Sequence, residues 1–449
     1  MLKIYSTLTR KKEEFKPLKG NKVNLFVCGI TPYDYAHIGH AKTYIQFDII
    51  VKYLRYKKYK VFYLQNITDI DDKIINRAKE LNMPFDKLAR EYEKCYYEDM
   101  KSLGVNSVDK YARATDFIKD IVSQIERLMK KGFAYKISDG IYFDLTKFKD
   151  YGELSGRTTS SGEDAVSRID ENIEKKNKGD FCLWKYSKES EPSWETELKK
   201  GRPGWHIEDT AITEKEFGPQ YDIHGGAKDL IFPHHEAEIA QMESISGKKP
   251  LVKYWLHTGF LNVSGQKMSK SLGNFFTIRD ILKKYNAKTL RFLFIQTHYR
   301  SAIDFSESSL ESAKNSLERL NDFMMKLKTG KDNLPDSYLK KVKENFIKAM
   351  DDDFDTPKAL AVIFNLVKEA NTKGGGKKAY SLMLEFDKIF NILDYEGIKM
   401  PSDLKELLKK REEARKNKDY KKADILRDKI KQKGYIIEDS DKGLLLKKI

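Results

Sequence analysis

The chain has 449 residues, a length that fits two to four domains better than one compact core. Hydrophobic residues make up 40% of the chain, which excludes a wholly disordered protein, and no run approaches the ~20 apolar residues of a transmembrane helix. The net charge of +16 favours a polyanionic partner, although a general excess of surface lysine would give the same balance. We expect a cytoplasmic protein with no membrane partner, because no apolar signal-peptide core follows Met1.

The first part of the chain alternates between strand and helix patterns. Residues 23–27 form a short apolar run, typical of a buried strand, and a helix is expected from about 41 to 56. A second strand is expected at 61–65, followed by a helix opened by the acidic residues of 69–72, where carboxylates suit the helix dipole. This alternation predicts an α/β fold with a parallel sheet.

The alternation is interrupted between about 145 and 205, where Gly, Ser, Glu and Lys dominate. This composition predicts an inserted region of loops and short elements. The pattern then resumes with an expected strand at 221–224, a helix at 233–246 and a strand at 254–261. The simplest account is a single Rossmann-like parallel sheet that is split by an insertion.

After about residue 278 the sequence predicts helix almost throughout, and residues 434–449 look like a small extended cap. An α-helical bundle and a small C-terminal domain are therefore expected after the sheet. The expected segments are 1–145 (first half of the Rossmann-like catalytic domain), 146–205 (inserted connective region), 206–277 (second half of the catalytic domain), 278–400 (helical bundle) and 401–449 (small basic C-terminal domain).

Two short motifs point to phosphate chemistry. His37-Ile38-Gly39-His40 follows the first strand at the start of a helix, where free N–H groups bind phosphate. Lys267-Met268-Ser269-Lys270-Ser271 lies in a Gly-rich loop, where two lysines suit the developing charge of pyrophosphate. Either motif alone could occur by chance, the second as an exposed basic loop. Together, in this order and flanking a split sheet, they resemble the signatures of the class I aminoacyl-tRNA synthetases.

Further stretches narrow this resemblance to the cysteinyl-tRNA synthetases, essentially from end to end. They are residues 28–34 (CGITPYD), 66–73 (NITDIDDK), 202–208 (RPGWHIE), 222–226 (DIHGG) and 232–238 (FPHHEAE). The resemblance implies a ligase that activates L-cysteine with ATP and Mg²⁺ to cysteinyl-adenylate and pyrophosphate. The cysteinyl group then passes to the 3′-terminal adenosine of tRNA(Cys). We expect the enzyme to be a monomer.

The family is known for one zinc ion per chain that binds the substrate thiol. The matching positions here are Cys28, Asp209, His234 and Glu238. His234 and Glu238 are four residues apart and share a helix face, a spacing that also occurs in ordinary solvated helices. Asp209 stands where the family usually has cysteine, and zinc also accepts carboxylate oxygen. The alternatives are direct ligation by Asp209, or a carboxylate that stands off through water and leaves the metal weakly held.

The resemblance also assigns roles to other positions. The catalytic residues would be His37, His40, Lys267 and Lys270. The ATP-binding residues would be Gly39, His40, Gly225, Gly226, Asp229 and Lys270. The cysteine-binding residues would be Cys28, Thr68, Trp205 and His224, although tryptophan is often plain core. Because serine and cysteine are near-isosteres that a shape pocket separates poorly, the zinc would supply the discrimination.

The basic segment between 411 and 427 is expected to meet tRNA phosphates through Arg411, Arg415, Lys422 and Arg427. The alternative is an exposed helix laced with i,i+4 ion pairs. The family often has an aromatic residue near its extreme C-terminus that helps to read the anticodon, but residues 443–448 offer none here. The alternatives are stacking from elsewhere, with Tyr435 as the candidate, or weaker stacking. Two rival functions are ligation of cysteine to a small amine and RNA binding without catalysis.

Overall fold

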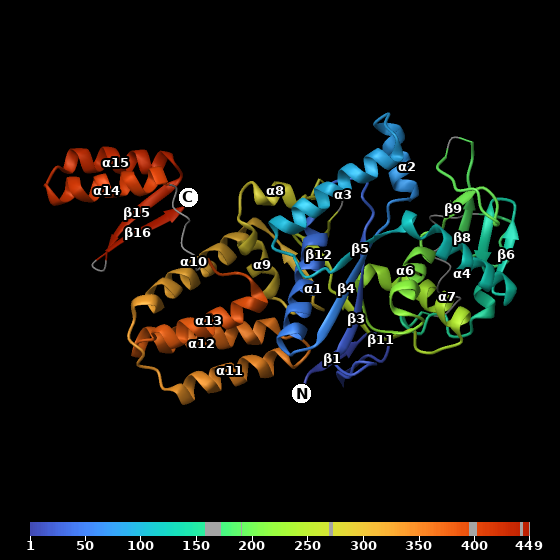
Figure 1. Ribbon diagram of the computed structural model, residues 1–449, viewed down its shortest axis with the longest axis horizontal. Helices are drawn as coiled ribbons and strands as arrows, with labels where there is room; N and C mark the ends of the chain where they lie inside the picture. Colours follow the sequence, from blue (N-terminus) through green and yellow to red (C-terminus); the bar gives the residue numbers. More distant parts are fainter. Residues whose placement is uncertain (158–171, 190, 269–272, 395–401, 441–442, 449) are drawn as a thin grey trace.

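The computed structural model describes residues 1–157, 172–189, 191–268, 273–394, 402–440 and 443–448. At its centre is a five-stranded sheet in the order β11–β10–β3–β4–β5, in which every neighbouring pair is parallel (Figure 1). The strands are β3 (Lys22–Ile30), β4 (Lys60–Ile67), β5 (Lys110–Arg113), β10 (Tyr221–Ala227) and β11 (Val252–Thr258). The predicted Rossmann-like parallel sheet is thus confirmed.

Strand β3 shows why the apolar runs form this sheet. Val23, Leu25, Phe26 and Val27 are all fully buried, so side chains on both faces of the strand lie in the core, as parallel strands covered by helices require. Strand β10 pairs directly with β3, although about 200 residues separate them. The two halves of the catalytic domain therefore meet at the centre of the sheet, where β3 and β10 lie side by side and their carboxyl ends point the same way.

The helices of this part cover the sheet and lead into the bundle. They are α1 (Ile38–Tyr56), α2 (Asp72–Glu80), α3 (Phe85–Ser102), α4 (Ile118–Lys130), α6 (Ile207–Phe217) and α7 (Glu236–Ser246), with short turns η1 (Ala114–Phe117), η2 (Leu145–Lys147), η3 (Lys228–Leu230) and η4 (Ile231–His235). Asp71 caps α2 by accepting from the backbone N–H of Lys73, as the acidic run predicts.

The region expected to be inserted, 146–205, holds short strands joined by loops, as the sequence predicts: β8 (Phe181–Tyr186) and β9 (Gly201–Pro203) lie in it. These strands belong to a four-stranded antiparallel sheet with neighbours in chain order. Its other two strands, β6 (Ala134–Ile137) and β7 (Gly140–Phe143), precede residue 145. The sheet itself was not predicted, because strands of three to six residues are too short to show a clear period. Fully buried Trp184 provides part of the core of this sheet.

A small sheet follows the main one and carries the second signature. It consists of β12 (Leu261–Val263), β13 (Gln266–Lys267) and β14 (Ile303–Phe305), while an N-terminal hairpin is formed by β1 (Lys3–Ser6) and β2 (Lys11–Glu14). Of the expected strand at 254–261, the part up to Thr258 belongs to β11, and Leu261 already starts β12.

The predicted helical bundle is also present. Its helices are α8 (Ile278–Leu282), α9 (Ala287–Ile295), α10 (Glu307–Thr329), α11 (Asp336–Met350), α12 (Thr356–Lys373) and α13 (Lys377–Phe390). Helix α1 reaches into it: the Tyr53 hydroxyl bonds Asp351 at 2.7 Å, and buried Arg291 pairs with buried Asp48 at 2.8 Å. One continuous apolar core therefore joins the sheet to the bundle.

The C-terminal unit consists of α14 (Ser402–Lys416), α15 (Tyr420–Gln432) and the antiparallel hairpin of β15 (Tyr435–Ser440) and β16 (Gly443–Lys448) (Figure 1). The hairpin matches the extended cap that the sequence predicts. A small core of its own contains Leu404, Leu408, Ile430 and Tyr435. Within the described ranges, every helix is too short or too polar to cross a membrane.

Candidate metal centre and active site

Four donors of the kinds that bind zinc converge beside the central sheet. Cys28 comes from β3, Asp209 from the first turn of α6, and His234 and Glu238 from η4 and the start of α7. Their ligand atoms all lie within 4.8 Å of one another, and all four residues are buried. The Nε2 atom of His234 lies 3.0 Å from Asp209 Oδ2 and 3.1 Å from Glu238 Oε1. The structure thus brings together the four positions that the sequence selects.

Asp209 is oriented as a ligand would be. Its Oδ1 atom accepts a hydrogen bond from Asn66 Nδ2 at 2.6 Å, so only Oδ2 faces the other donors. The buried Oε1 of Glu238 accepts no hydrogen bond from the described residues. One thiol, one imidazole and two carboxyl groups aimed at the same point suit a divalent cation, because buried carboxylates are not stable without a partner. The residues present therefore fit zinc.

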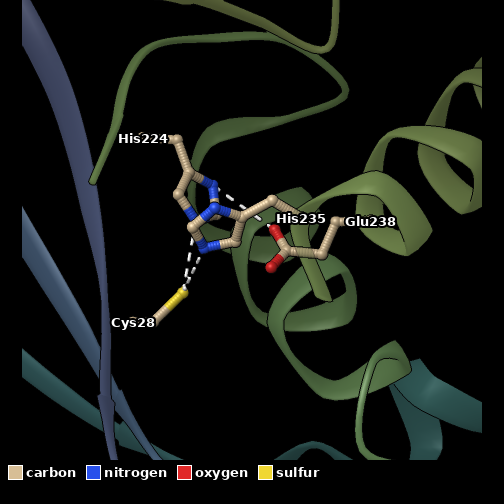
Figure 2. A group of neighbouring side chains, drawn as sticks. All are labelled: Cys28, His224, His235 and Glu238. Carbon is tan, nitrogen blue, oxygen red and sulfur yellow. Dashed lines mark hydrogen bonds and ion pairs between the residues drawn. The ribbon is translucent and has the colours of Figure 1, made fainter. Parts of the chain in front are cut away.

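A second donor set overlaps the first and was not predicted from the sequence. It comprises Cys28 from β3, His224 from β10, His235 from the end of η4 and Glu238 from the start of α7, which approach one another in Figure 2. Cys28 Sγ lies 3.3 Å from His224 Nε2 and 3.1 Å from His235 Nε2. The sequence signal for His235 was its position beside His234, but the family pattern assigns a metal role only to His234.

The histidines of both sets are held by neighbours outside them. His235 Nδ1 lies 2.8 Å from His257 Nε2, and His257 Nδ1 lies 2.7 Å from Thr7 Oγ1. His234 Nδ1 lies 2.9 Å from His206 Nδ1. A bond at one ring nitrogen fixes the ring and directs the other nitrogen, which is how second-layer groups orient metal ligands. His206 and His257 are thus supporting residues that the sequence did not identify.

The electrostatics of the site favour bound protons or a bound cation. Burial raises the pKa of Glu238 well above its usual range, and the charges of Asp209 and Glu208 raise it further. Burial likewise raises the pKa of Glu208, with Asp209 as the next cause, and raises the pKa of the Cys28 thiol. A divalent cation would displace the protons of its own ligands, Cys28 and Glu238, by stabilising their ionised forms.

The predicted cysteine-binding residues surround this centre. Trp205 stacks on the His234 ring with centroids 4.6 Å apart, so it is not simply core. His224 is fully buried, and its Nδ1 lies 2.6 Å from the Tyr221 hydroxyl. Thr68 is buried and its hydroxyl donates to the Glu208 carboxylate, so Thr68 contacts a neighbour of the metal set.

The first signature forms the N-terminus of α1. His37 is the cap: its Nδ1 accepts from the backbone N–H groups of Gly39 at 3.1 Å and His40 at 3.3 Å. The His37 and His40 rings stack with centroids 3.7 Å apart. Burial lowers the pKa of His40 well below its usual value, and nearby His37 and Lys73 lower it further. A side chain at Gly39 would collide with the His37 ring, which explains the glycine.

Met268 of the second signature lies near the first. The backbone N–H of Ile38 donates to the Phe276 carbonyl at 3.1 Å, and a Cβ added at Gly39 would lie 3.8 Å from Met268 Cε. Lys267 belongs to β13, and Lys270 lies outside the described residues. Met268 and Phe276 thus lie at the start of α1.

The glycines predicted to bind ATP have a packing role of their own. A Cβ at Gly225 would lie 2.3 Å from the Phe47 ring, and one at Gly226 would lie 2.9 Å from the His235 ring. These contacts let β10 lie close to α1 and η4. Asp229 is exposed on η3. Their contact with ATP stays a prediction.

Two predictions for RNA contacts need correction. Arg411 is only 4% exposed, so it is not available to a phosphate, whereas Arg415, Lys422 and Arg427 are exposed on α14 and α15. Tyr435 is buried in the core of the C-terminal unit, where it cannot stack on an anticodon base.

A parallel sheet with the first signature at the start of α1, and with Met268 of the second beside it, defines a class I aminoacyl-tRNA synthetase. The family model described as "tRNA synthetases class I (C) catalytic domain" matches residues 14–315, and the DALR domain model matches residues 345–434. A methionyl-tRNA synthetase structure from Mycobacterium tuberculosis, in complex with methionyl-adenylate, shares the fold with a TM-score of 0.62 at 17% identity. That likeness covers 83% of this chain and 89% of that one.

Curated relatives narrow the class. A cysteine–tRNA ligase of Thermoplasma volcanium is 47% identical, covering 97% of both chains, and one of Thermococcus onnurineus is 43% identical, covering 100% of this chain and 99% of that one. A bacterial cysteine–tRNA ligase, from Hahella chejuensis, is 43% identical, covering 99% of each chain. The chain belongs to the class I (C) tRNA synthetases, the family of the cysteine–tRNA ligases, which are ATP-dependent aminoacyl-tRNA ligases.

Proposed function

We propose that this enzyme ligates L-cysteine to tRNA(Cys), with selection of the substrate thiol by a bound zinc ion. The observation that carries the proposal is the convergence of Cys28, Asp209, His234 and Glu238 within 4.8 Å. A thiol-binding metal solves the discrimination that shape alone cannot, since one atom distinguishes cysteine from serine. The full-length similarity to cysteine–tRNA ligases supports the same substrate.

The chain's own residues divide the work. Cys28, Asp209, His234 and Glu238 would hold the zinc, which when bound supplies a Lewis acid for the substrate sulfur. Trp205, stacked on His234, covers this side of the site and would press the amino acid against it. The cysteine carboxylate then attacks the α-phosphate of ATP, and His37, His40, Lys267 and Lys270 stabilise the developing phosphate charge, with Mg²⁺ accompanying ATP.

Asp209 is proposed as a direct ligand. Its fixed orientation supports this, because Asn66 holds one oxygen and leaves the other facing His234. Exchanging a family thiolate for a carboxylate keeps the formal charge of the set but makes it harder, with one protein sulfur in place of two. Water-mediated contact is the alternative that ligand substitution will distinguish.

We further propose a monomeric, cytoplasmic enzyme with the segment boundaries at 145, 205, 277 and 400 given above. The long helical bundle and the C-terminal unit favour a tRNA acceptor over a small amine, because a small amine requires no such surface. Arg415, Lys422 and Arg427 are the proposed phosphate contacts in the C-terminal unit. The proposed ATP-binding residues are Gly39, His40, Gly225, Gly226, Asp229 and Lys270, of which Asp229 would hold ribose hydroxyls.

Pyrophosphate exchange tests the proposal. The purified enzyme should exchange pyrophosphate into ATP with cysteine and not with serine, and removal of zinc should abolish exchange until zinc is restored. Charging of tRNA(Cys) should follow when tRNA is added. Exchange without charging would favour the small-amine ligase, and tRNA binding without exchange would favour a non-catalytic RNA-binding protein.

A further inference from the structure

An exposed aromatic ring stands at the mouth of the first signature. Tyr35 lies in the loop between β3 and α1, and its large aromatic side chain is 40% exposed. It lines a hollow whose wall also includes Thr31, His37, His40 and Phe275. Tyr35 is thus two residues from the catalytic motif, at the rim and not in the interior of the site.

The ring is held in place by two neighbouring helices. Arg279 of α8 lies over the Tyr35 ring, with its guanidinium carbon 4.9 Å from the centroid. The guanidinium is itself fixed by ion pairs to Asp99 at 2.8 Å and Glu98 at 2.9 Å, both on α3. Tyr92, also on α3, meets the Tyr35 ring edge-on at a centroid distance of 5.3 Å. In Figure 1, α3 and α8 lie side by side, as these ion pairs require.

Such an arrangement exposes a rigid aromatic surface. An exposed tyrosine ring without contacts samples several rotamers, whereas the contacts with Arg279 and Tyr92 fix the Tyr35 ring before any ligand binds. A pre-fixed ring lowers the entropic cost of binding a flat group against it. Nucleobases are flat groups that stack on such aromatic rings, because every base has a π-face.

The ammonium group of Lys73, which lies near the Tyr33 ring, suits the phosphate backbone of a nucleic acid. Lys73 on α2 is exposed and lies 5.8 Å from the centroid of the neighbouring Tyr33 ring. Its charge also reaches the first signature, since it helps to lower the pKa of His40. Within the described residues Lys73 has no carboxylate within 4.0 Å, whereas Arg279 is neutralised by its α3 partners. An ammonium near aromatic rings is the pattern of single-strand binding surfaces.

We propose that Tyr35, held by Arg279 and Tyr92, is a platform on which an unpaired base next to the 3′-terminal adenosine of the tRNA stacks, with Lys73 meeting its backbone. This inference rests on the proposed function. To accept the cysteinyl group, the terminal adenosine must enter the hollow, so the preceding nucleotides must cross its rim. The adenine of ATP is the alternative occupant, and the KM for ATP distinguishes it from a tRNA base.

Measuring adenylate formation and transfer of cysteine to tRNA separately tests the role of Tyr35. Tyr35→Ala should slow single-turnover transfer of cysteine from preformed adenylate to subsaturating tRNA(Cys) by about 5- to 150-fold, the range of one lost base–aromatic stack. Cysteine-dependent pyrophosphate exchange and the KM for ATP should change less than about twofold, and this activity also shows that the variant is folded. Tyr35→Phe keeps the ring and should match the wild type in both assays.

A modified substrate provides the decisive comparison. tRNA(Cys) made abasic at each of the two positions before the terminal adenosine should be transferred slowly by the wild type, and Tyr35→Ala should cause no further loss on the tRNA that lacks the stacked base. Equal losses on intact and abasic tRNA would overturn the proposal. So would a raised KM for ATP in Tyr35→Ala, which would identify an adenine site, or a Tyr35→Phe variant as slow as Tyr35→Ala. If the wild type shows no cysteine-dependent exchange, the proposed function itself fails, and that outcome is visible before any variant is compared.

Discussion

Zinc binding to this centre should release protons in a countable way. Burial raises the pKa of both the Cys28 thiol and the Glu238 carboxyl, so at pH values below the raised pKa of Glu238 each should carry a proton when no metal is bound. Both protons must leave when these groups become zinc ligands. The zinc association constant should therefore rise about 100-fold per pH unit, or about 2.7 kcal/mol, because each released proton contributes about 1.36 kcal/mol per unit. As pH rises through the pKa of Glu238, the slope should fall toward one proton.

Substitutions at position 209 turn this slope into a test of ligation. In Asp209→Cys a second buried thiol must ionise to bind zinc, so the slope should rise to about three protons per zinc. Asp209→Asn keeps the shape of the side chain but removes its charge, so zinc affinity should fall without any rise in slope. Glu208→Gln is the matched control, because Glu208 is equally buried beside Asp209 but belongs to neither donor set.

The assay is competition for zinc with a chromophoric chelator at several pH values, with the proton count checked by calorimetry in buffers of different ionisation enthalpy. The Glu208→Gln control should keep a slope of about two. If Asp209→Cys shows the wild-type slope and Asp209→Asn keeps the wild-type affinity, Asp209 is not a ligand, and water or another side chain completes the set. A wild-type slope near zero would refute the assignment of raised pKa values to Cys28 and Glu238.

Three further predictions address the rest of the enzyme. Lys270→Ala should lower the pre-steady-state rate of adenylate formation by about 10²–10³-fold with little change in cysteine affinity, since a preorganised cation is lost; an unchanged rate would remove Lys270 from the catalytic set. Replacing Arg415, Lys422 and Arg427 with Gln should weaken tRNA binding and reduce the slope of log affinity against log salt by about two to three, whereas equal slopes would exclude these contacts. Burial lowers the pKa of Lys42 to about 7, so the unfolded chain binds a proton that the folded chain lacks between about pH 7 and 10, and stability gains up to about 1.4 kcal/mol per pH unit. Lys42→Met should remove this gain, as thermal unfolding at pH 7 and pH 9 would reveal.

The central sheet and the first signature could be predicted because their signals are local. Residues 23–27 are apolar apart from Asn24, a pattern typical of a strand buried on both faces, and the structure has β3 there. The helix that follows begins at its signature, with His37 as its cap. The four metal positions were predicted from the family pattern, and the departure at Asp209 was visible in the same comparison.

The parts that could not be predicted depend on contacts between distant segments. Strand β7, just before the insertion, and β8, within it, pair across a gap of nearly 40 residues, and neither is long enough to show alternation. The supporting roles of His206, His235 and His257 appear only when α6, η4 and β11 come together. Seven of the eight histidines precede residue 260, which indicates chemistry in that part of the chain but not which ring bonds to which.

The burial of Arg411 differs, because the sequence did contain its signal. Leu404, Leu408 and Arg411 follow one another at spacings of four and three residues, which places Arg411 on the apolar face of α14. Counting positive charges over the segment hid this periodicity. Charge composition predicts a partner class, whereas helical spacing decides which of the charges can reach that partner.

The two overlapping donor sets differ in which of them a substrate can approach. Cys28 and Glu238 belong to both, so the choice is between Asp209 with His234 and His224 with His235. The rings of His224 and His235 are fully buried, stacked or tilted against Trp255, and fixed by Tyr221 and His257. His234 instead lies under Trp205, which is partly exposed. A substrate thiol entering beside Trp205 would therefore meet a cation held by Asp209 and His234. His224 and His235 contact Cys28 Sγ from the buried side of the site.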